Sequence, residues 1–234
     1  MTPSTDVCLL PFSPPSLTPT TDKIDTMSEE LKVENISQHP DPFALTDPLA
    51  LFDQWFKLAE ASEPNDPNAA SLATATADGT PSVRMVLAKR VAGYPFCFFT
   101  NAEGRKGREL AENPRVALCF HWKTLRRQVR VEGRVSLLDP AETDQYFHSR
   151  SRKSQIGAAV SKQSRVLSSR EELEEQVKSF SDQHPGEIPR PDHWKGYRVA
   201  VERIEFWIDG ANRLHDRFLF TRSGDTWDTV RLYP

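Results

Sequence analysis

The feature that most constrains this fold is a series of short apolar runs joined by tight turns. The runs are rich in β-branched and aromatic residues and are bounded by Asp-Gly, Gly or Asn-Pro signals, a pattern typical of strands in hairpins. Because hairpins pair neighbouring strands antiparallel, the pattern predicts a mainly β protein with flanking helices, built on an antiparallel barrel rather than a parallel doubly wound sheet. The predicted strands are 71–77, 84–89, 96–101, 115–122, 125–138, 197–208, 213–221 and 227–232.

Capping signals predict four helices between these strands. Two of them start at Asp-Pro, which supplies an N-cap acceptor and a proline in the first turn. A Ser-Ser pair followed by two glutamates fits a capping box. The predicted helices are 48–64, 105–112, 140–149 and 170–181, with a basic linker at 150–154 and a loop at 184–193.

Composition bounds the domain organisation and the compartment. Residues 1–45 are rich in Pro, Ser and Thr and are predicted to be disordered, which leaves one domain at 46–234. Met27 offers an alternative start, and no signal peptide, transit peptide or membrane-spanning run is recognised. A net charge of -3 gives no global attraction to nucleic acid or to an anionic membrane. Three cysteines without metal spacing, of which Cys97 and Cys119 are predicted in the core, suit a reducing cytoplasm.

A helix start beside two cations is the first candidate site. Gly104-Arg105-Lys106 opens the helix of 105–112 directly after a strand. Free backbone N–H groups, the positive end of the helix dipole and two side-chain charges together suit a phosphate. The alternative is that Arg105, Lys106 and Arg108 merely cover a solvated helix, because short basic clusters are common on surfaces.

The segment 213–217, Arg-Leu-His-Asp-Arg, is the sharpest local feature. On a strand, alternation places Arg213, His215 and Arg217 on one face, where the charges repel one another unless an anion lies between them. A phosphate or carboxylate ligand is therefore favoured. The alternative is an edge strand whose charges protect against aggregation.

Three further groups leave two readings each. Arg84 and Lys89 are an odd number of residues apart, so either a bulge intervenes or they point to opposite faces of a strand. Tyr146 and Arg150 form an i, i+4 pair that either binds a ligand or is an ordinary surface pair. Trp207 either stacks on a planar ligand or fills the core.

Several chemistries lack support in the sequence. The six histidines show none of the close pairing that metal sites need, so no metal is predicted. G-x-S-x-G, Walker and G-x-G-x-x-G motifs are absent, which disfavours hydrolase triads and the common nucleotide-binding folds.

A set of strings in fixed order carries a family resemblance. The strings are 84–89 (Arg-Met-Val-Leu-Ala-Lys), 99–101 (Phe-Thr-Asn), 104–106, 113–116, 127–129, 146–150 (Tyr-Phe-His-Ser-Arg), 154–158, 160–164, 205–207 and 213–217. From about Asp47 to Pro234 the sequence resembles the pyridoxine/pyridoxamine 5'-phosphate oxidase family. The resemblance implies an FMN-binding split β-barrel and a homodimer with the flavin at the subunit interface.

The resemblance also implies residue roles. The implied FMN set is Arg84, Met85, Val86, Leu87, Ala88, Lys89, Phe99, Thr100, Arg105, Lys106, Gln128, Gln163, Ser164, Trp207 and Arg217. The implied substrate set is Lys89, Tyr146, Arg150, Ser154, Arg213, Leu214 and His215, with Arg213, His215 and Asp66 as catalytic candidates.

The implied reaction is the oxidation of pyridoxamine or pyridoxine 5'-phosphate to pyridoxal 5'-phosphate. FMN takes the hydride and O2 reoxidises it to H2O2, with ammonia released from the amine. The basic substrate-covering segment common near the family's N-terminus is replaced here by Ser-Gln-His-Pro-Asp-Pro at 37–42, and the stretch after Ser164 is one residue short. The remaining alternatives are a split-barrel reductase with another substrate and a non-catalytic FMN or pyridoxal phosphate carrier.

Overall fold

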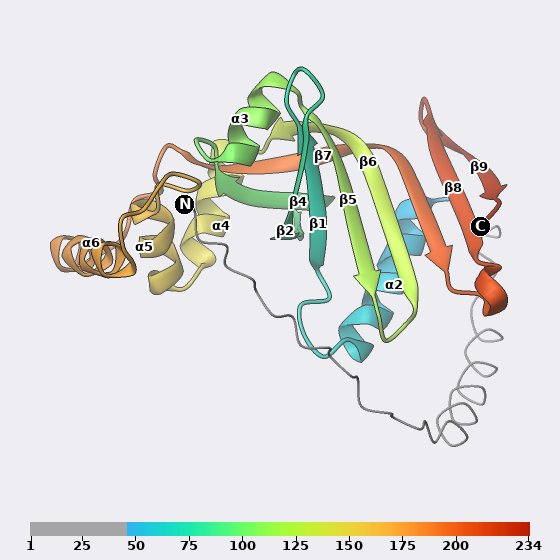
Figure 1. Ribbon diagram of the computed structural model, residues 1–234, viewed down its shortest axis with the longest axis horizontal. Coiled ribbons are helices and arrows are strands. Elements are labelled where there is room, and N and C mark those ends of the chain that lie inside the picture. The colour runs from blue at the N-terminus through green and yellow to red at the C-terminus, as the bar shows by residue number, and fades with distance from the viewer. Residues whose placement is uncertain (1–45) are drawn as a thin grey trace, which may run out of the picture. The chain divides into compact units, whose positions relative to one another are not determined.

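One antiparallel sheet organises the chain. In the computed structural model, which describes residues 46–234, nine strands pair in the order β2-β1-β5-β6-β7-β4-β3, with β8 beside β7 and β9 beside β8 (Figure 1). Every pairing is antiparallel, which confirms the predicted barrel type. The strands are β1 Ala69–Ala75, β2 Pro81–Leu87, β3 Lys89–Val91, β4 Tyr94–Asn101, β5 Arg115–Trp122, β6 Arg127–Leu137, β7 Trp194–Ile208, β8 Asp216–Ser223 and β9 Thr226–Leu232.

The long strand β7 links the two halves of the sheet. Along one edge it pairs with β6, whereas along the other its first residues pair with β4 and its last residues pair with β8. A bulge between Glu132 and Gly133 bends the β6–β7 pair. A Cβ at Gly133 would lie 2.1 Å from the carbonyl oxygen of Ala200, so only glycine permits this approach. The bend lets the sheet curl as a split barrel.

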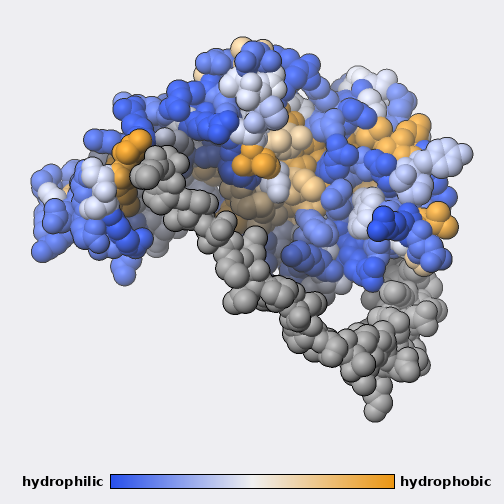
Figure 2. Space-filling model, in the orientation of Figure 1, coloured by the Kyte–Doolittle hydropathy of each residue, from blue (hydrophilic) through white to orange (hydrophobic). Residues whose placement is uncertain are grey.

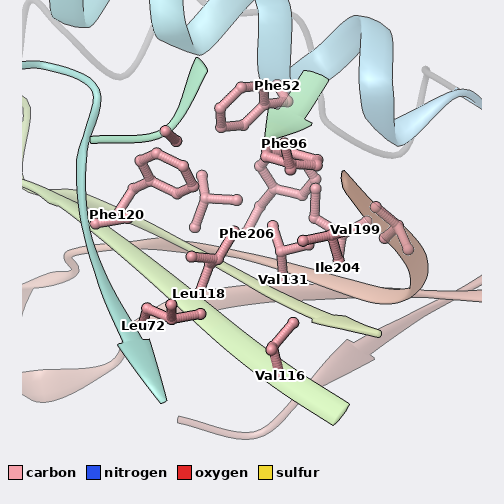
Figure 3. Close-up of a cluster of buried hydrophobic side chains, with 14 of the residues drawn as sticks. Phe52, Leu72, Phe96, Val116, Leu118, Phe120, Val131, Val199, Ile204 and Phe206 are labelled. Atoms are coloured by element: carbon pink, nitrogen blue, oxygen red, sulfur yellow. The ribbon is translucent and has the colours of Figure 1, made fainter. Parts of the chain in front are cut away.

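Helix α2 (Pro48–Ser62) closes the curled sheet with an aromatic core. Asp47 caps it by accepting a hydrogen bond from the Leu49 N–H at 2.9 Å. Its buried face carries Phe52 and Trp55 toward the strands, and Phe52 packs edge-on against Phe96 at 4.6 Å between ring centroids (Figure 3). Each such buried ring contributes about 2–3 kcal/mol through apolar burial, which makes this interface the main hydrophobic core.

A group of helices lies beside the start of β7 (Figure 1). These helices are α3 Arg105–Glu112, α4 Pro140–Ser149, α5 Arg152–Val160 and α6 Arg170–Gln183. Phe147 of α4, Ile156 of α5, Ile188 and Trp194 form a second buried cluster. With Phe99 of β4 and residues of α6 packed against it, the cluster ties α4, α5 and α6 to β4 and to the start of β7.

Three sequence predictions are wrong at particular residues. The basic linker at 150–154 is the start of α5, because Ser151 caps it by accepting from the Ser154 N–H. The strand predicted from Arg213 begins only at Asp216, and Arg213 ends a short 3-10 turn, η2 Ala211–Arg213. Of the two cysteines predicted in the core, Cys97 is buried but Cys119 is half-exposed.

Some predictions concern parts of the chain outside the described residues. The disorder of 1–45, the alternative start at Met27 and the altered segment at 37–42 all lie there. Within 46–234, no helix has the length and apolarity needed to cross a membrane. In the same residues no three or more His, Cys, Asp or Glu side chains gather as a metal site would require.

Candidate active site

The first turn of α3 is enclosed by side chains from two other segments. The Arg105 backbone N–H donates to Ser164 Oγ at 3.2 Å. Lys106 Nζ donates to Thr100 Oγ1 at 2.9 Å and to Gln163 Oε1 at 2.8 Å. Four residues of the implied FMN set, together with Arg105, therefore surround one helix N-terminus. We call this group, completed by Arg84 below, the α3 seat.

A buried carboxylate, Glu109, holds the arginines of the α3 seat in place. The side chain is only 4% exposed and forms ion pairs with Arg84 Nη2 at 3.1 Å and Arg105 Nε at 2.8 Å. Ser82 Oγ donates to it at 2.6 Å, and Thr74 Oγ1 donates a further hydrogen bond. Glu109 thus fixes the positions of both arginines before any ligand is present.

The charges of the α3 seat leave an excess that suits a phosphate. Burial alone raises the pKa of Glu109, but hydrogen bonds from Ser82, Thr74 and the arginines outweigh it and lower the pKa to about 2. The pKa of Lys106 is lowered, first by burial and then by the nearby charge of Arg84. Three cations around one carboxylate give a net charge of two, the charge of a phosphate dianion.

Arg105 and Arg108 of α3 are both exposed, but their partners differ. Arg108 is exposed and donates to the backbone carbonyl of Glu103. Lys106, in contrast, is half-buried and turned toward β4, and Arg105 is clamped to Glu109. The anion-seat reading therefore fits Arg105 and Lys106.

An irregularity separates Arg84 from Lys89. Between β2 and β3, the Ala88 N–H donates to the Asn68 carbonyl at 2.9 Å, and Asn68 Nδ2 donates back to the Ala88 carbonyl at 3.0 Å. The break matches the bulge alternative for these two cations. Asp66 lies in the loop between α2 and β1, which also contains Asn68, and it is exposed. The Lys89 backbone pairs with Cys97 of β4, but the Lys89 side chain makes no hydrogen bond or ion pair with any residue in the described part of the chain.

A column of stacked rings stands beside the α3 seat. Phe99, next to Thr100 on β4, stacks on Tyr146 at 4.0 Å and on Trp194 at 5.0 Å between centroids. The guanidinium of Arg150 lies over the Trp194 ring at 5.0 Å. Such cation–π contacts orient the planar guanidinium as well as stabilise it. Tyr146 and Arg150 are thus more than a surface pair.

The Arg150 guanidinium has an unused donor. Its Nη1 is buried and has no hydrogen-bond partner among the described residues. Burial lowers the pKa of Arg150, with Tyr146 opposing the shift. A buried donor without an acceptor is costly unless a ligand supplies one. Ser154 follows Arg150 by four residues, lies in the first turn of α5 and is exposed. Its hydroxyl shares a hydrogen bond with Ser151 Oγ, with 2.9 Å between the oxygens.

The other end of β7 carries the remaining implied catalytic residues. Arg213 and Asn212 are non-glycine residues with left-handed backbones, at φ 64° and 55°. His215 packs on Trp207 with ring centroids 4.6 Å apart, and its Nδ1 lies 3.2 Å from Asp209 Oδ1. Trp207, for which the sequence left both stacking on a ligand and core filling open, is partly exposed and lies outside the buried core. The three-cation row predicted for a strand is wrong, because only Arg217 lies on β8.

Arg217 is already paired within the chain. Its Nε donates to Glu205 Oε1 at 2.8 Å and its Nη1 donates to the Tyr233 carbonyl at 3.0 Å. The Glu205 hydrogen bond is the main cause that raises the pKa of Arg217. Gln128 lies opposite Trp207 in the β6–β7 register, so three members of the implied FMN set occupy neighbouring strands.

The structure separates the implied substrate residues into two groups. Lys89, Tyr146, Arg150 and Ser154 belong to the β3–β4 side and the helices at the start of β7, whereas Arg213, Leu214 and His215 follow the end of β7 (Figure 1). From Trp194 to Trp207 the strand covers about 40 Å of chain at the usual rise. One copy of the chain therefore does not bring all implied substrate residues together.

Five residues that support the site were not singled out from the sequence. Glu109 is four residues after Arg105, and that i, i+4 spacing was a usable signal. The others act across segments far apart in the chain and carried no local signal. The five are Asn68, Glu109, Trp194, Glu205 and Asp209.

Comparison with known proteins assigns this architecture. A solved structure of PhzG from Burkholderia lata 383, in complex with tetrahydrophenazine-1-carboxylic acid, is 31% identical and superposes with a TM-score of 0.77 over 83% of this chain and 95% of that one. A pyridoxamine 5'-phosphate oxidase-related, FMN-binding protein from Nostoc punctiforme PCC 73102 shares the fold at 13% identity, with a TM-score of 0.67 over 81% of this chain and 98% of that one. The class is therefore the split β-barrel.

Sequence relatives narrow the class to a family. The model of the family described as pyridoxamine 5'-phosphate oxidase matches residues 58–184, and that of a pyridoxine 5'-phosphate oxidase C-terminal dimerisation region matches 194–234. Proteins named pyridoxine/pyridoxamine 5'-phosphate oxidase are 57% identical in Gluconobacter oxydans, over 80% of this chain and 94% of that one, and 54% identical in Rhodospirillum rubrum, over 80% and 96%. The chain belongs to the pyridoxamine 5'-phosphate oxidase family.

Proposed function

We propose that this protein oxidises pyridoxamine 5'-phosphate and pyridoxine 5'-phosphate to pyridoxal 5'-phosphate with bound FMN and O2. The amine reaction consumes O2 and water and yields the aldehyde, ammonia and H2O2, and the alcohol reaction yields the aldehyde and H2O2. Support comes from the family membership and from two cationic groups. The α3 seat contacts Thr100 of β4, and the rings beside Arg150 contact the neighbouring Phe99. The observation that carries the proposal is the unpartnered, buried Nη1 of Arg150 beside the α3 seat.

The α3 seat suits the FMN phosphate. Its excess of two positive charges and the positive end of the α3 dipole match a phosphate dianion. Arg84, Arg105 and Lys106 are held by Glu109, Thr100 and Gln163, so little reorganisation is needed on binding. When bound, FMN supplies the two-electron acceptor for oxidation at C4' of the substrate and the reactivity toward O2.

The chain's own residues bind and orient the substrate. Arg150, Tyr146 and Ser154 suit its 5'-phosphate, with Lys89 as a further cation that no described side chain neutralises. The rings of Phe99, Tyr146 and Trp194 exclude water beside that site, which strengthens the charge contacts. Arg213 and His215 would orient the pyridine ring and stabilise charge as it develops at the reacting carbon.

We propose a homodimer in which each active site takes Arg150 from one copy and Arg213 from the other. The separation of these residues along β7 supports it, as does the match of 194–234 to a dimerisation region. On β2, alternate side chains Val83, Met85 and Leu87 are 67%, 62% and 47% exposed, and Figure 2 shows apolar side chains reaching the surface in this view. An exposed apolar row of this kind suits burial by a second copy.

A mixed-dimer experiment tests both parts of the proposal. Arg150→Ala and Arg213→Ala chains are each expected to lose turnover with little loss of FMN. Co-expressed with different affinity tags, they form mixed dimers in which one of the two sites has both residues intact. Random mixing should then restore about a quarter of the wild-type activity. If the purified mixed dimers are inactive, one chain supplies both residues of each site.

The rival functions make different predictions in one aerobic assay. Wild-type protein, pyridoxamine 5'-phosphate and O2 should give an absorbing aldehyde and H2O2, and unphosphorylated pyridoxamine should react far more weakly. Yellow protein without turnover of either B6 phosphate would support a carrier or, given the Burkholderia lata relative with its phenazine ligand, an oxidase of another substrate. Colourless protein that FMN cannot reconstitute would exclude all flavin functions.

A cytoplasmic location is also proposed, supported by Cys97 and Cys119, which form no disulfide.

A further inference from the structure

The loop after β7 is closed by a carboxylate that has no role in the implied site. Asp209 Oδ1 lies 3.2 Å from His215 Nδ1, and its second oxygen forms an ion pair with Arg126. Its backbone N–H also donates to the Arg126 carbonyl at 3.1 Å. Asp209 thus connects the β5–β6 turn, the end of β7 and the start of β8.

The loop that Asp209 closes is tightly folded and strained. Asn212 and Arg213 both hold left-handed backbones that non-glycine residues disfavour. A Cβ at Gly210 would lie 1.9 Å from the Leu214 carbonyl oxygen, so the two sides of the loop touch through backbone. Such a conformation persists only where surrounding contacts enforce it. The ends of this loop are joined by the β7–β8 pairing of Ile208 with Asp216, by the ring contact of Trp207 with His215, and by the contacts of His215 with Asp209 and Gly210.

His215 Nδ1 faces two groups of the loop. The Gly210 N–H donates to it at 3.2 Å, and the Asp209 carboxylate lies at the same distance. No described residue hydrogen-bonds Nε2, so this nitrogen is left to act outside the loop. Trp207 packs against the ring at a tilt of 43° and limits its rotation.

We propose that Asp209 is a positioning residue for the oxidation reaction. It holds the His215 ring with Nδ1 turned inward and Nε2 outward, and it keeps the strained turn that presents Arg213. This inference rests on the proposed function, in which His215 and Arg213 face the substrate. Asp209 itself touches neither substrate nor flavin.

Two substitutions of the carboxylate test this role in the full-length FMN-loaded enzyme. Asp209→Ala removes the carboxylate that lies against Nδ1 and is expected to lower kcat with pyridoxamine 5'-phosphate by roughly 10- to 100-fold, because small misplacement of an orienting group has that effect. Asp209→Asn keeps an acceptor oxygen of the same shape and should recover most of the loss. FMN affinity should change far less than kcat in both variants, because the α3 seat lies at the other end of β7 and the nearer FMN candidates, Gln128, Trp207 and Arg217, are held by strand pairing. Glu202→Gln, which breaks the exposed ion pair of β7 with Arg115, is the matched control with unchanged turnover.

The outcomes separate this inference from the proposed function. Wild-type enzyme without B6-phosphate oxidation would defeat the proposed function before any variant is compared. Active wild type with an Asp209→Ala variant of unchanged kcat would overturn the positioning role. Equal losses in the Ala and Asn variants, accompanied by loss of FMN or a lowered Tm, would also overturn it, since they would indicate a purely structural contact.

Discussion

The two ends of β7 carry candidate functional groups of opposite character. At its start, the α3 seat and the ring column are anchored by buried partners, above all Glu109 and Trp194. At its end, Arg213 is exposed on a strained turn held by Asp209. One end is complete within a single copy, whereas the other presents its cation to the outside.

In the proposed site shared by two copies, the two ends of β7 have different tasks. A phosphate site needs its cations in fixed positions. The chain orients Arg84 and Arg105 in advance through ion pairs with the buried carboxylate of Glu109. Residues that act on a substrate bound by another copy must instead project from the surface. The exposed strained turn satisfies this requirement, because strain fixes a side chain where no core can surround it.

Removal of Glu109 should give the largest effect at the start of β7. Glu109→Ala leaves the charges of Arg84, Arg105 and Lys106 without a counterion and is expected to lower the unfolding free energy by about 3–5 kcal/mol. Urea unfolding of the FMN-free protein measures it. Glu112→Ala, on an exposed position of the same helix, should change stability by less than about 0.5 kcal/mol. Similar values for both variants would show that the seat is not preorganised by Glu109.

Acid should weaken the same anchor. The folded pKa of Glu109 is about 2, below its ordinary 4.5, so its stabilisation is present above about pH 4.5 and is lost as the pH falls toward 2. The shift corresponds to about 3 kcal/mol of unfolding free energy. Urea titrations between pH 5 and pH 2 should show a steeper decline for wild type than for Glu109→Gln. Parallel declines would contradict the lowered pKa.

Loss of one seat arginine should weaken the flavin without affecting the far end. Arg105→Ala is expected to reduce FMN affinity by about 1.5–3 kcal/mol, the scale of a charged hydrogen bond. Flavin fluorescence titration measures the affinity. Arg108→Ala serves as the control on the same helix, because that side chain faces solvent, and Arg213→Ala should also bind FMN normally. A greater loss with Arg213→Ala would reverse the assignment of the two ends.

The smallest expected effect concerns the ring beneath Arg150. Trp194→Leu removes the cation–π contact and should raise KM for pyridoxamine 5'-phosphate by about tenfold, with kcat little changed. Trp194→Phe keeps an aromatic face and should stay within about threefold. Steady-state kinetics on FMN-saturated enzyme separates the two constants. If the two variants share one KM, the ring does not orient the guanidinium.

Local signals predicted the elements whose causes are local. The Asp-Gly and Gly turns fixed the hairpins, and Asp47 and Asp139 cap helices as their Asp-Pro signals indicated. Helix α5 was missed because basic residues and Gly157 weaken its apolar pattern, while its cap, Ser151, was not recognised. The turn at Arg213 was missed because the sequence Asn-Arg carries no glycine to signal a left-handed backbone.

The sequence alone determined an antiparallel split barrel and the identity of the cations, since strand alternation, turn residues and helix caps act between near neighbours in the chain. Tertiary structure decided which carboxylate holds each cation, and it left Arg127 and Arg150 each with a buried Nη1 that has no hydrogen-bond partner among the described residues. It also placed Arg150 and Arg213 at opposite ends of β7. Charge pairing and burial depend on distances between segments that are remote in the chain. The folded backbone, including the bent strand β7, sets those distances, and no single position encodes them.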